Sequence, residues 1–134
     1  MAVIDRIDLH IGEHSGTAFI EVTWGATGNQ IDIETRQAYR EVVELVGLDI
    51  GPGQDGVSDP IADGVISDRI RTFTAAVSSF ADTKQKRLPV GALDEDGPLR
   101  SSQIAARISL IPLPPRTIAR LSNVINRPAP GLHP

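Results

Sequence analysis

Residues 3–24, VIDRIDLHIGEHSGTAFIEVTW, contain the clearest structural pattern in the sequence. Residues 3–11 alternate between apolar and polar side chains, with Asp5 as the exception, and a second alternating run follows a short turn at residues 13–16. The second run divides into two faces: Ala18, Ile20, Val22 and Trp24 on one, Phe19, Glu21 and Thr23 on the other. Alternation of this kind is typical of a strand with one buried face. The stretch therefore predicts an antiparallel β-hairpin.

Outward from this hairpin, the spacing of apolar residues changes. Asp32 is placed to cap a helix that runs to about Val46, because apolar residues then recur at steps of three and four. In that helix Glu41 and Glu44 occupy the solvent side, and Gly47 marks the end. We expect this to be the strongest helix in the chain.

Two further segments also have helical spacing. Residues 66–80 have apolar side chains at alternating steps of four and three, which favours a helix over about Ser67–Lys84. The same residues are rich in β-branched and aromatic side chains, so a strand is the alternative. An apolar stripe over residues 116–126 favours another helix.

A later strand and a proline-rich end complete the organisation. Residues 103–111 alternate and are apolar at the end, as in a strand inside a sheet, and Pro112 would end it. We therefore expect an α+β fold: a small antiparallel sheet, made of the N-terminal hairpin plus this later strand, covered by two or three helices. Residues 1–127 would form one domain, and residues 128–134, with three prolines, an extended C-terminal tail.

Composition excludes several classes of protein. The 134 residues include 13 Lys and Arg against 17 Asp and Glu, giving a net charge of -4, and contain no cysteine. Disulfides and thiolate metal sites are therefore excluded. The basic residues are scattered apart from one cluster at residues 84–87, so we expect no nucleic-acid partner. No apolar run reaches the ~18 residues of a membrane span, and the first residues do not have the pattern of a signal peptide. We expect a cytoplasmic protein, or part of a particle assembled inside the cell.

His10-Ile11-Gly12-Glu13-His14 has the H-x-x-E-H spacing of inverted zinc peptidases. In those enzymes the motif lies on a helix, where two histidines four residues apart reach one zinc ion. Here His10 ends an alternating run, and Ser15-Gly16 follows His14 at once. We therefore interpret these residues as strand and turn polarity and expect no metal or cofactor. The alternative is a metal-binding or proton-linked site of different geometry, with His10, Glu13 and His14 as the catalytic candidates.

A narrow sheet would leave apolar strand surface uncovered. We therefore expect a non-catalytic structural or assembly subunit that contacts copies of itself or other protein subunits, for example in a viral or phage-like particle. The residues expected at the interface are Phe19, Trp24, Pro128, Pro130 and Leu132. The main alternative is a small-molecule enzyme or binding module with a pocket near the hairpin. A third interpretation, from the proline-rich residues 111–116, is a ligand for a peptide-recognition domain.

Overall fold

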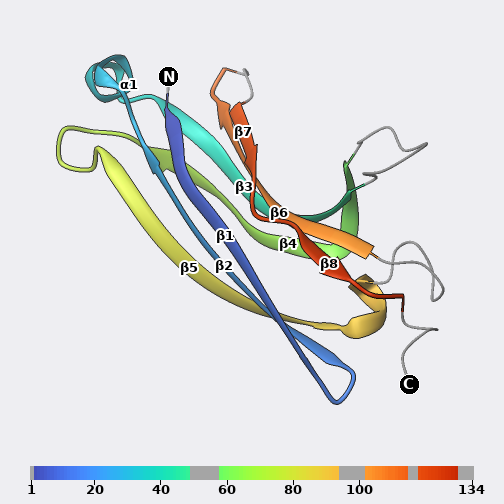
Figure 1. Cartoon of the computed structure of the whole chain (residues 1–134). Helices are drawn as coiled ribbons and strands as arrows, with labels where there is room; N and C mark the ends of the chain where they lie inside the picture. The colour runs from blue at the N-terminus through green and yellow to red at the C-terminus, as the bar shows by residue number, and fades with distance from the viewer. Residues whose placement is uncertain (1, 49–57, 94–101, 115–117, 130–134) are drawn as a thin grey trace.

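Two antiparallel β-sheets packed face to face make up the fold of the computed structural model, which describes residues 2–48, 58–93, 102–114 and 118–129 (Figure 1). The first sheet has the order β1-β2-β5, and the second has the order β4-β3-β6-β7, with β8 also paired to β6. The strands are β1 Val3–His14, β2 Thr17–Thr27, β3 Ala38–Leu48, β4 Ser58–Thr72, β5 Ser79–Pro89, β6 Ser102–Pro112, β7 Ile118–Leu121 and β8 Ile125–Arg127. The described helices are short: α1 covers Gln30–Thr35 and the 3-10 turn η1 covers Val90–Leu93.

The predicted N-terminal hairpin is confirmed, with β1 paired to β2 from Val3↔Thr27 to His14↔Thr17. The exception at Asp5 has a structural cause, because the register shifts between Ile4 and Arg6. Such a bulge places an extra residue in one strand and changes which face its neighbours occupy. As a result Ile4 is buried, whereas Val3, which the alternation placed with the buried residues, is 61% exposed.

The helix predicted from Asp32 to Val46 is wrong. The six residues of α1 follow Asn29, whose side chain accepts a hydrogen bond from the Asp32 N–H while the Asp32 carboxylate accepts one from the Asn29 N–H. Arg36 ends the helix with a φ of 51°. Strand β3 follows and pairs with both β4 and β6. From Tyr39 to Leu45 its buried side chains alternate, as in a strand, and they include Glu41, which the helix prediction placed on the solvent side. These buried side chains are Tyr39, Glu41, Val43 and Leu45.

The other two predicted helices are also wrong. Residues 67–84 form the end of β4, a turn and the start of β5, so the strand alternative holds for part of residues 66–80. Residues 116–126 contain β7 and the start of β8. The α+β class is therefore corrected to a fold made almost entirely of antiparallel sheet. The later strand is confirmed as β6, which lies inside its sheet between β3 and the short strands β7 and β8.

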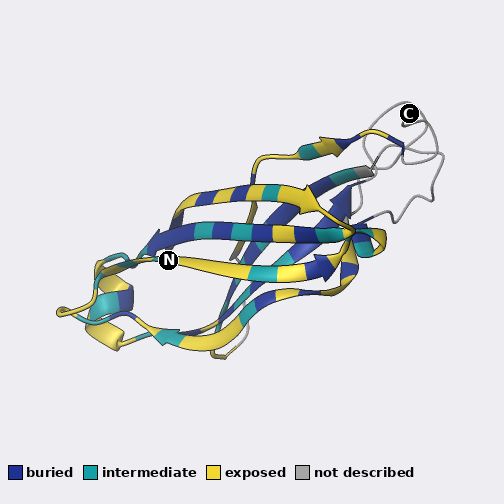
Figure 2. Ribbon diagram, turned by 90° about the horizontal axis from the view of Figure 1, so that it is seen from below, coloured by how far each residue is buried: buried dark blue, intermediate teal, exposed yellow. Residues whose placement is uncertain are grey.

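The core lies between the two sheets and takes one residue in two from their strands (Figure 2). The first sheet contributes Ile20, Val22 and Trp24, and the second contributes Ile108 and Leu110, each at most 2% exposed. The apolar face of the hairpin is thus covered by the chain itself. This removes the physical reason for which the sequence predicted a subunit partner on that face.

Side chains of residues 120–127 close the outer edge of β1. The Asn123 amide accepts a hydrogen bond from the Leu9 N–H at 2.8 Å and donates one to the Leu9 carbonyl at 3.1 Å. Arg120 donates to the Ile4 carbonyl at 2.7 Å. Arg127 pairs with Glu13 at 2.8 Å. These contacts occupy the N–H and C=O groups of Leu9 and the C=O group of Ile4, which hinders the addition of another strand at this edge.

Two glycines provide a matched test of this packing. An added Cβ at Gly28 would lie 2.6 Å from Cγ of the buried Phe73 ring, whereas one at Gly12 would meet nothing within 4 Å. We expect Gly28→Ala to lower the free energy of unfolding by about 1–3 kcal/mol through overpacking. Gly12→Ala should leave it unchanged or raise it by about 0.5–1 kcal/mol, because glycine is unfavourable inside a strand. Urea denaturation followed by the emission of the single tryptophan measures both, and equal effects at the two positions would contradict the packing described.

Candidate functional site

The outer face of the β1-β2-β5 sheet carries the candidate site. Because side chains in paired positions share a face, the register brings residues from three separated strands into rows. One row contains His10, Glu21 and Gln85. The next contains Gly12, Phe19 and Arg87. The sequence had placed Phe19 and Glu21 on one face of this strand and Ala18, Ile20, Val22 and Trp24 on the other, and the structure confirms that division.

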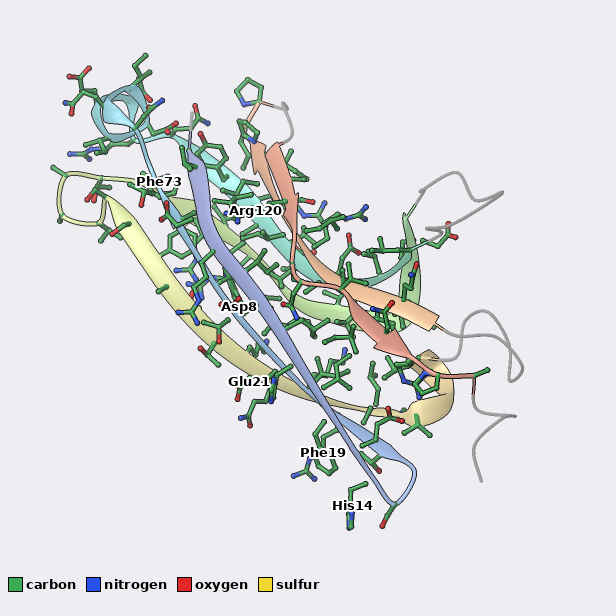
Figure 3. The ribbon with its side chains drawn as sticks, viewed as in Figure 1. Asp8, His14, Phe19, Glu21, Phe73 and Arg120 are labelled. Carbon is green, nitrogen blue, oxygen red and sulfur yellow. The ribbon has the colours of Figure 1, made fainter. Side chains whose placement is uncertain are left out.

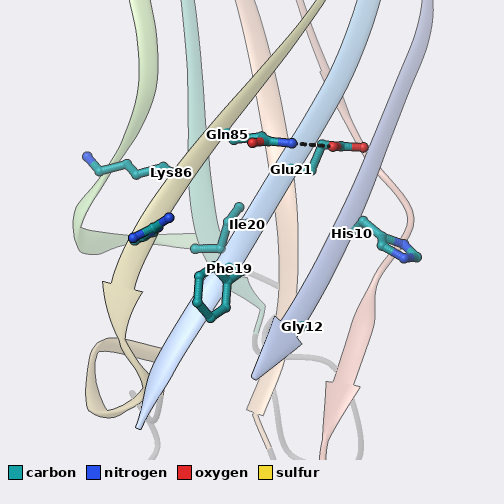
Figure 4. A pocket seen from close by; sticks show the side chains of 8 residues that line it. His10, Gly12, Phe19, Ile20, Glu21, Gln85 and Lys86 are labelled. Atoms are coloured by element: carbon teal, nitrogen blue, oxygen red, sulfur yellow. Dashed lines mark hydrogen bonds between the residues drawn. The ribbon is translucent and has the colours of Figure 1, made fainter. Parts of the chain in front are cut away.

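A groove of about 530 Å³ lies over these two rows (Figure 4). Phe19 forms its apolar part and is 41% exposed. Beside it, no atom lies within 4 Å of the position that a Cβ of Gly12 would occupy, so the glycine leaves space next to the ring. The full lining is His10, Gly12, Phe19, Ile20, Glu21, Gln85, Lys86 and Arg87.

Polar side chains hold fixed positions around the groove. Gln85 donates from its amide to the Glu21 carboxylate at 2.9 Å. The Arg87 guanidinium lies 5.2 Å from the centre of the Phe19 ring, in range for a cation–π contact. Lys86, paired with the buried Ile20, directs its side chain to the opposite face and donates to the Val65 carbonyl of β4 at 2.9 Å. The groove thus combines a half-exposed ring with donors and acceptors that can orient a ligand.

The three residues of the H-x-x-E-H motif are separated by strand geometry. His10 and His14 share the outer face of β1, but four strand residues span about 13 Å, too far for one metal ion. Glu13 points to the other face and pairs with Arg127. Within the described ranges, no group of three or more His, Cys, Asp or Glu residues is placed to hold a metal ion. His10 reaches the groove, and Figure 3 shows His14 further along, at the hairpin end of the molecule.

The residues expected at an interface have different positions. Phe19 lies in the groove, whereas Trp24 is 2% exposed and belongs to the core, so its indole is not available as a surface anchor in the single chain. Pro128 is exposed. Pro130 and Leu132 lie outside the described residues, so the predicted role of the tail remains a prediction.

A charged cluster between the sheets was not expected from the sequence. Glu41 of β3 is fully buried and accepts a hydrogen bond from Arg71 of β4 at 3.1 Å. Arg71 also forms an ion pair with Asp82 of β5 and lies 4.0 Å over the centre of the Phe80 ring. The cluster therefore ties β3 and β4 of one sheet to β5 of the other. Had β3 been recognised as a strand from the sequence, the position of Glu41 among its inward-facing residues would have indicated this cluster.

Burial raises the pKa of the Glu41 carboxyl, and the nearby charge of Arg71 opposes this effect without reversing it. The Trp24 indole N–H and the Glu41 Oε1 atom are both buried, and neither makes a hydrogen bond of normal geometry. The indole N–H nevertheless favours the ionised carboxylate and so lowers the pKa of Glu41. We assign the cluster to holding the sheets together, because its groups face inward, on the opposite side of the first sheet from the groove.

A second buried polar contact fixes the position of α1. The Tyr39 hydroxyl donates to the Asp32 carboxylate at 2.6 Å. Burial, followed by this hydrogen bond, raises the pKa of Tyr39 to about 12. The hydroxyl therefore stays protonated at neutral pH and serves as a fixed donor, which joins α1 to the first residues of β3.

Comparisons with known proteins give a distant likeness of fold. No protein-family model and no curated protein matches the sequence. A Northeast Structural Genomics Consortium target, SoR45, is similar with a TM-score of 0.41 and 11% identity, over 98% of this chain and 89% of that one. The putative ApaA protein from Bordetella pertussis is similar with a TM-score of 0.40 and 10% identity, over 97% of this chain and 94% of that one. None of the helices in the described parts of this chain is long and apolar enough to cross a membrane.

The raised pKa of Glu41 predicts a pH dependence of stability. A carboxyl with a higher pKa in the fold than in the unfolded chain holds its proton more tightly in the fold. As the pH rises from the ordinary pKa of a glutamate, about 4.3, through the raised pKa of Glu41, ionisation of this carboxyl therefore lowers the free energy of unfolding. Because glutamine does not ionise, the stability of the wild type relative to Glu41→Gln should be greater at pH 4 than at pH 7.

Urea denaturation at the two pH values, followed by tryptophan emission, measures this difference. Glu41→Gln also weakens the pairing of Arg71, which shifts the variant's stability at both pH values and leaves the sign of the pH effect unchanged. A difference between the two proteins that stays constant, or that grows toward pH 7, would show that burial does not govern the ionisation of Glu41.

Proposed function

We propose that the protein is a non-catalytic binding module that acts through protein–protein contacts, and that the groove across β1, β2 and β5 receives a side chain of its partner. The observation that carries this proposal is the open space over Gly12 beside the half-exposed ring of Phe19. An aromatic ring in a recess is the kind of anchor that contributes most to protein interfaces. A partner's apolar side chain over Gly12 would cover the ring and remove it from water.

The polar groups of the groove favour binding over catalysis. His10 and Phe19 are exposed, and the Glu21 carboxylate is engaged by Gln85. Charge stabilisation in a reaction is strongest where water is excluded, and an open sheet face does not exclude it. The same groups are well suited to hydrogen bonds at the rim of an interface. The partner would be a second copy of the chain or another subunit of a larger complex.

A small-molecule ligand is the second candidate, and the size of the groove favours it. Its volume of about 530 Å³ lies in the range of roughly 300–1,000 Å³ that is common for ligand pockets. Hydrogen-bonding groups from His10, Glu21 and Gln85 converge beside an apolar ring. In this case the protein would carry or sense a ligand with one apolar and one polar end.

The test selects peptides from a displayed random library on the immobilised wild type, with Gly12→Val as the matched control. The Cβ of the valine would meet no atom within 4 Å, so we expect the variant to fold while its side chain fills space in the groove. We expect enriched peptides with an apolar anchor whose affinity falls at least about tenfold on Gly12→Val, equivalent to about 1.4 kcal/mol. Phe19→Ala should weaken them similarly, because it removes the ring.

Oligomeric state distinguishes the possible partners. If the partner is a second copy, sedimentation equilibrium should give a mass above the 14.3 kDa of one chain, and Gly12→Val should return it to that value. Three results together would favour the second candidate over the first: no peptide is enriched, the wild type is monomeric, and a member of a small-molecule library binds in the groove. Peptides that bind wild type and Gly12→Val equally well would show that the groove is not the contact site.

A further inference from the structure

The sheet edges in the described chain differ in how they are protected from pairing. The edge of β1 is occupied by side chains of residues 120–127. Strands β7 and β8 have only four and three residues. Strand β4 carries Pro60, a left-handed residue at Asp63, and two register shifts against β3. Short, irregular or covered edges are the usual ways in which proteins avoid adding a strand.

Strand β5 has none of these protections over its middle. It has eleven residues, pairs in unbroken register with β2, and has no other partner among the described strands. In an antiparallel pair, alternate residues direct their N–H and C=O groups toward the partner. The bonds from Gly28 N to the Ser78 carbonyl and from Val90 N to the Gly16 carbonyl fix which residues these are. By this alternation Thr83, Gln85 and Arg87 direct their backbone groups away from β2.

The same stretch is the most basic part of the sequence. Lys84, Lys86 and Arg87 lie within four residues of one another in a chain whose net charge is -4. Lys84 is exposed, and the Lys86 ammonium, bonded to the Val65 carbonyl, has two further N–H groups to donate. Antiparallel pairing of two β5 strands about Gln85 would place Lys84 of each copy opposite Lys86 of the other. Like charges in opposite positions destabilise a sheet, so this register disfavours a second copy.

We propose that the β5 edge binds an extended acidic peptide segment of another protein, which adds a fourth strand to the β1-β2-β5 sheet. Main-chain hydrogen bonds to residues 83, 85 and 87 would supply affinity. Acidic side chains two positions apart would lie opposite Lys84 and Lys86, because residues i and i+2 share a face. This goes beyond the proposed groove, since a strand beside β5 would lie three strand spacings, ~14 Å, from β1 and Gly12.

The probe is a capped eight-residue peptide that alternates valine and glutamate, with a fluorophore at one end. Two matched peptides separate the sources of affinity: one with lysine in place of glutamate, and one acidic peptide with alternate backbone amides methylated. We expect the acidic peptide to bind, with chemical-shift changes at the amides of residues 83–87, and both matched peptides to lose most of the affinity. Fluorescence anisotropy measures each dissociation constant.

Protein variants test the location of the site. Lys84→Glu should weaken the acidic peptide about fivefold or more, because it replaces an attraction with a repulsion. Arg36→Glu changes the net charge equally at another exposed position, in the left-handed residue after α1, and should change the affinity less than twofold. Gly12→Val should leave the affinity unchanged, which separates this site from the groove. Tryptophan emission confirms that each variant is folded.

Several results would overturn the proposal. Equal binding of the methylated acidic peptide would show a charge effect without strand addition. No binding of the acidic peptide, or equal loss with Arg36→Glu and Lys84→Glu, would show that the basic residues only keep the edge from pairing. A dimer of the wild type that Lys84→Glu stabilises would assign the edge to a second copy.

Discussion

The burial of one face of each sheet against the other is the interaction on which the rest of the structure depends. Every second residue of β2, from Ala18 to Ala26, is almost fully buried, and Ile104, Ala106, Ile108 and Leu110 of β6 behave in the same way. Burial of aliphatic side chains stabilises a fold by roughly 1.5–3 kcal/mol for each large one. Because side chains alternate across a strand, the same constraint determines which residues remain outside. The groove is formed by the half of β1, β2 and β5 that the core does not use.

The strands recognised from sequence share a simple feature. In the hairpin and in β6, apolar and polar residues alternate over many positions, and only a strand satisfies that pattern. Strand β3 was predicted as a helix because its apolar side chains also recur three and four residues apart. Its valines and its buried Glu41 are consistent with a strand, but pairing on both sides decides the outcome, and pairing is not visible in a local window. Because several strands were not predicted, the expected sheet was too narrow and the expected surface was too apolar.

The candidate site was partly predictable for the same reason. The alternation of the hairpin had placed Phe19 and Glu21 on one face of the second run, and His10 with the polar residues of the first. Gln85 and Arg87 were not, because they come from β5, which the sequence suggested was the end of a helix and a loop. The ligand-like spacing of His10, Glu13 and His14 lost its meaning once the residues were placed on a strand. A spacing acquires chemical meaning only with the secondary structure that carries it.

The two hydrogen bonds between the Asn123 side chain and the Leu9 backbone have a consequence for how the chain is made. The two residues are 114 positions apart, so the ribosome must make and release everything between them before these hydrogen bonds can form. Until then the nascent hairpin has one long strand with its amides and carbonyls accessible to neighbouring chains. Residues 120–127 therefore protect a strand that is made long before them, and a product that stops short of position 120 would leave that strand open to aggregation.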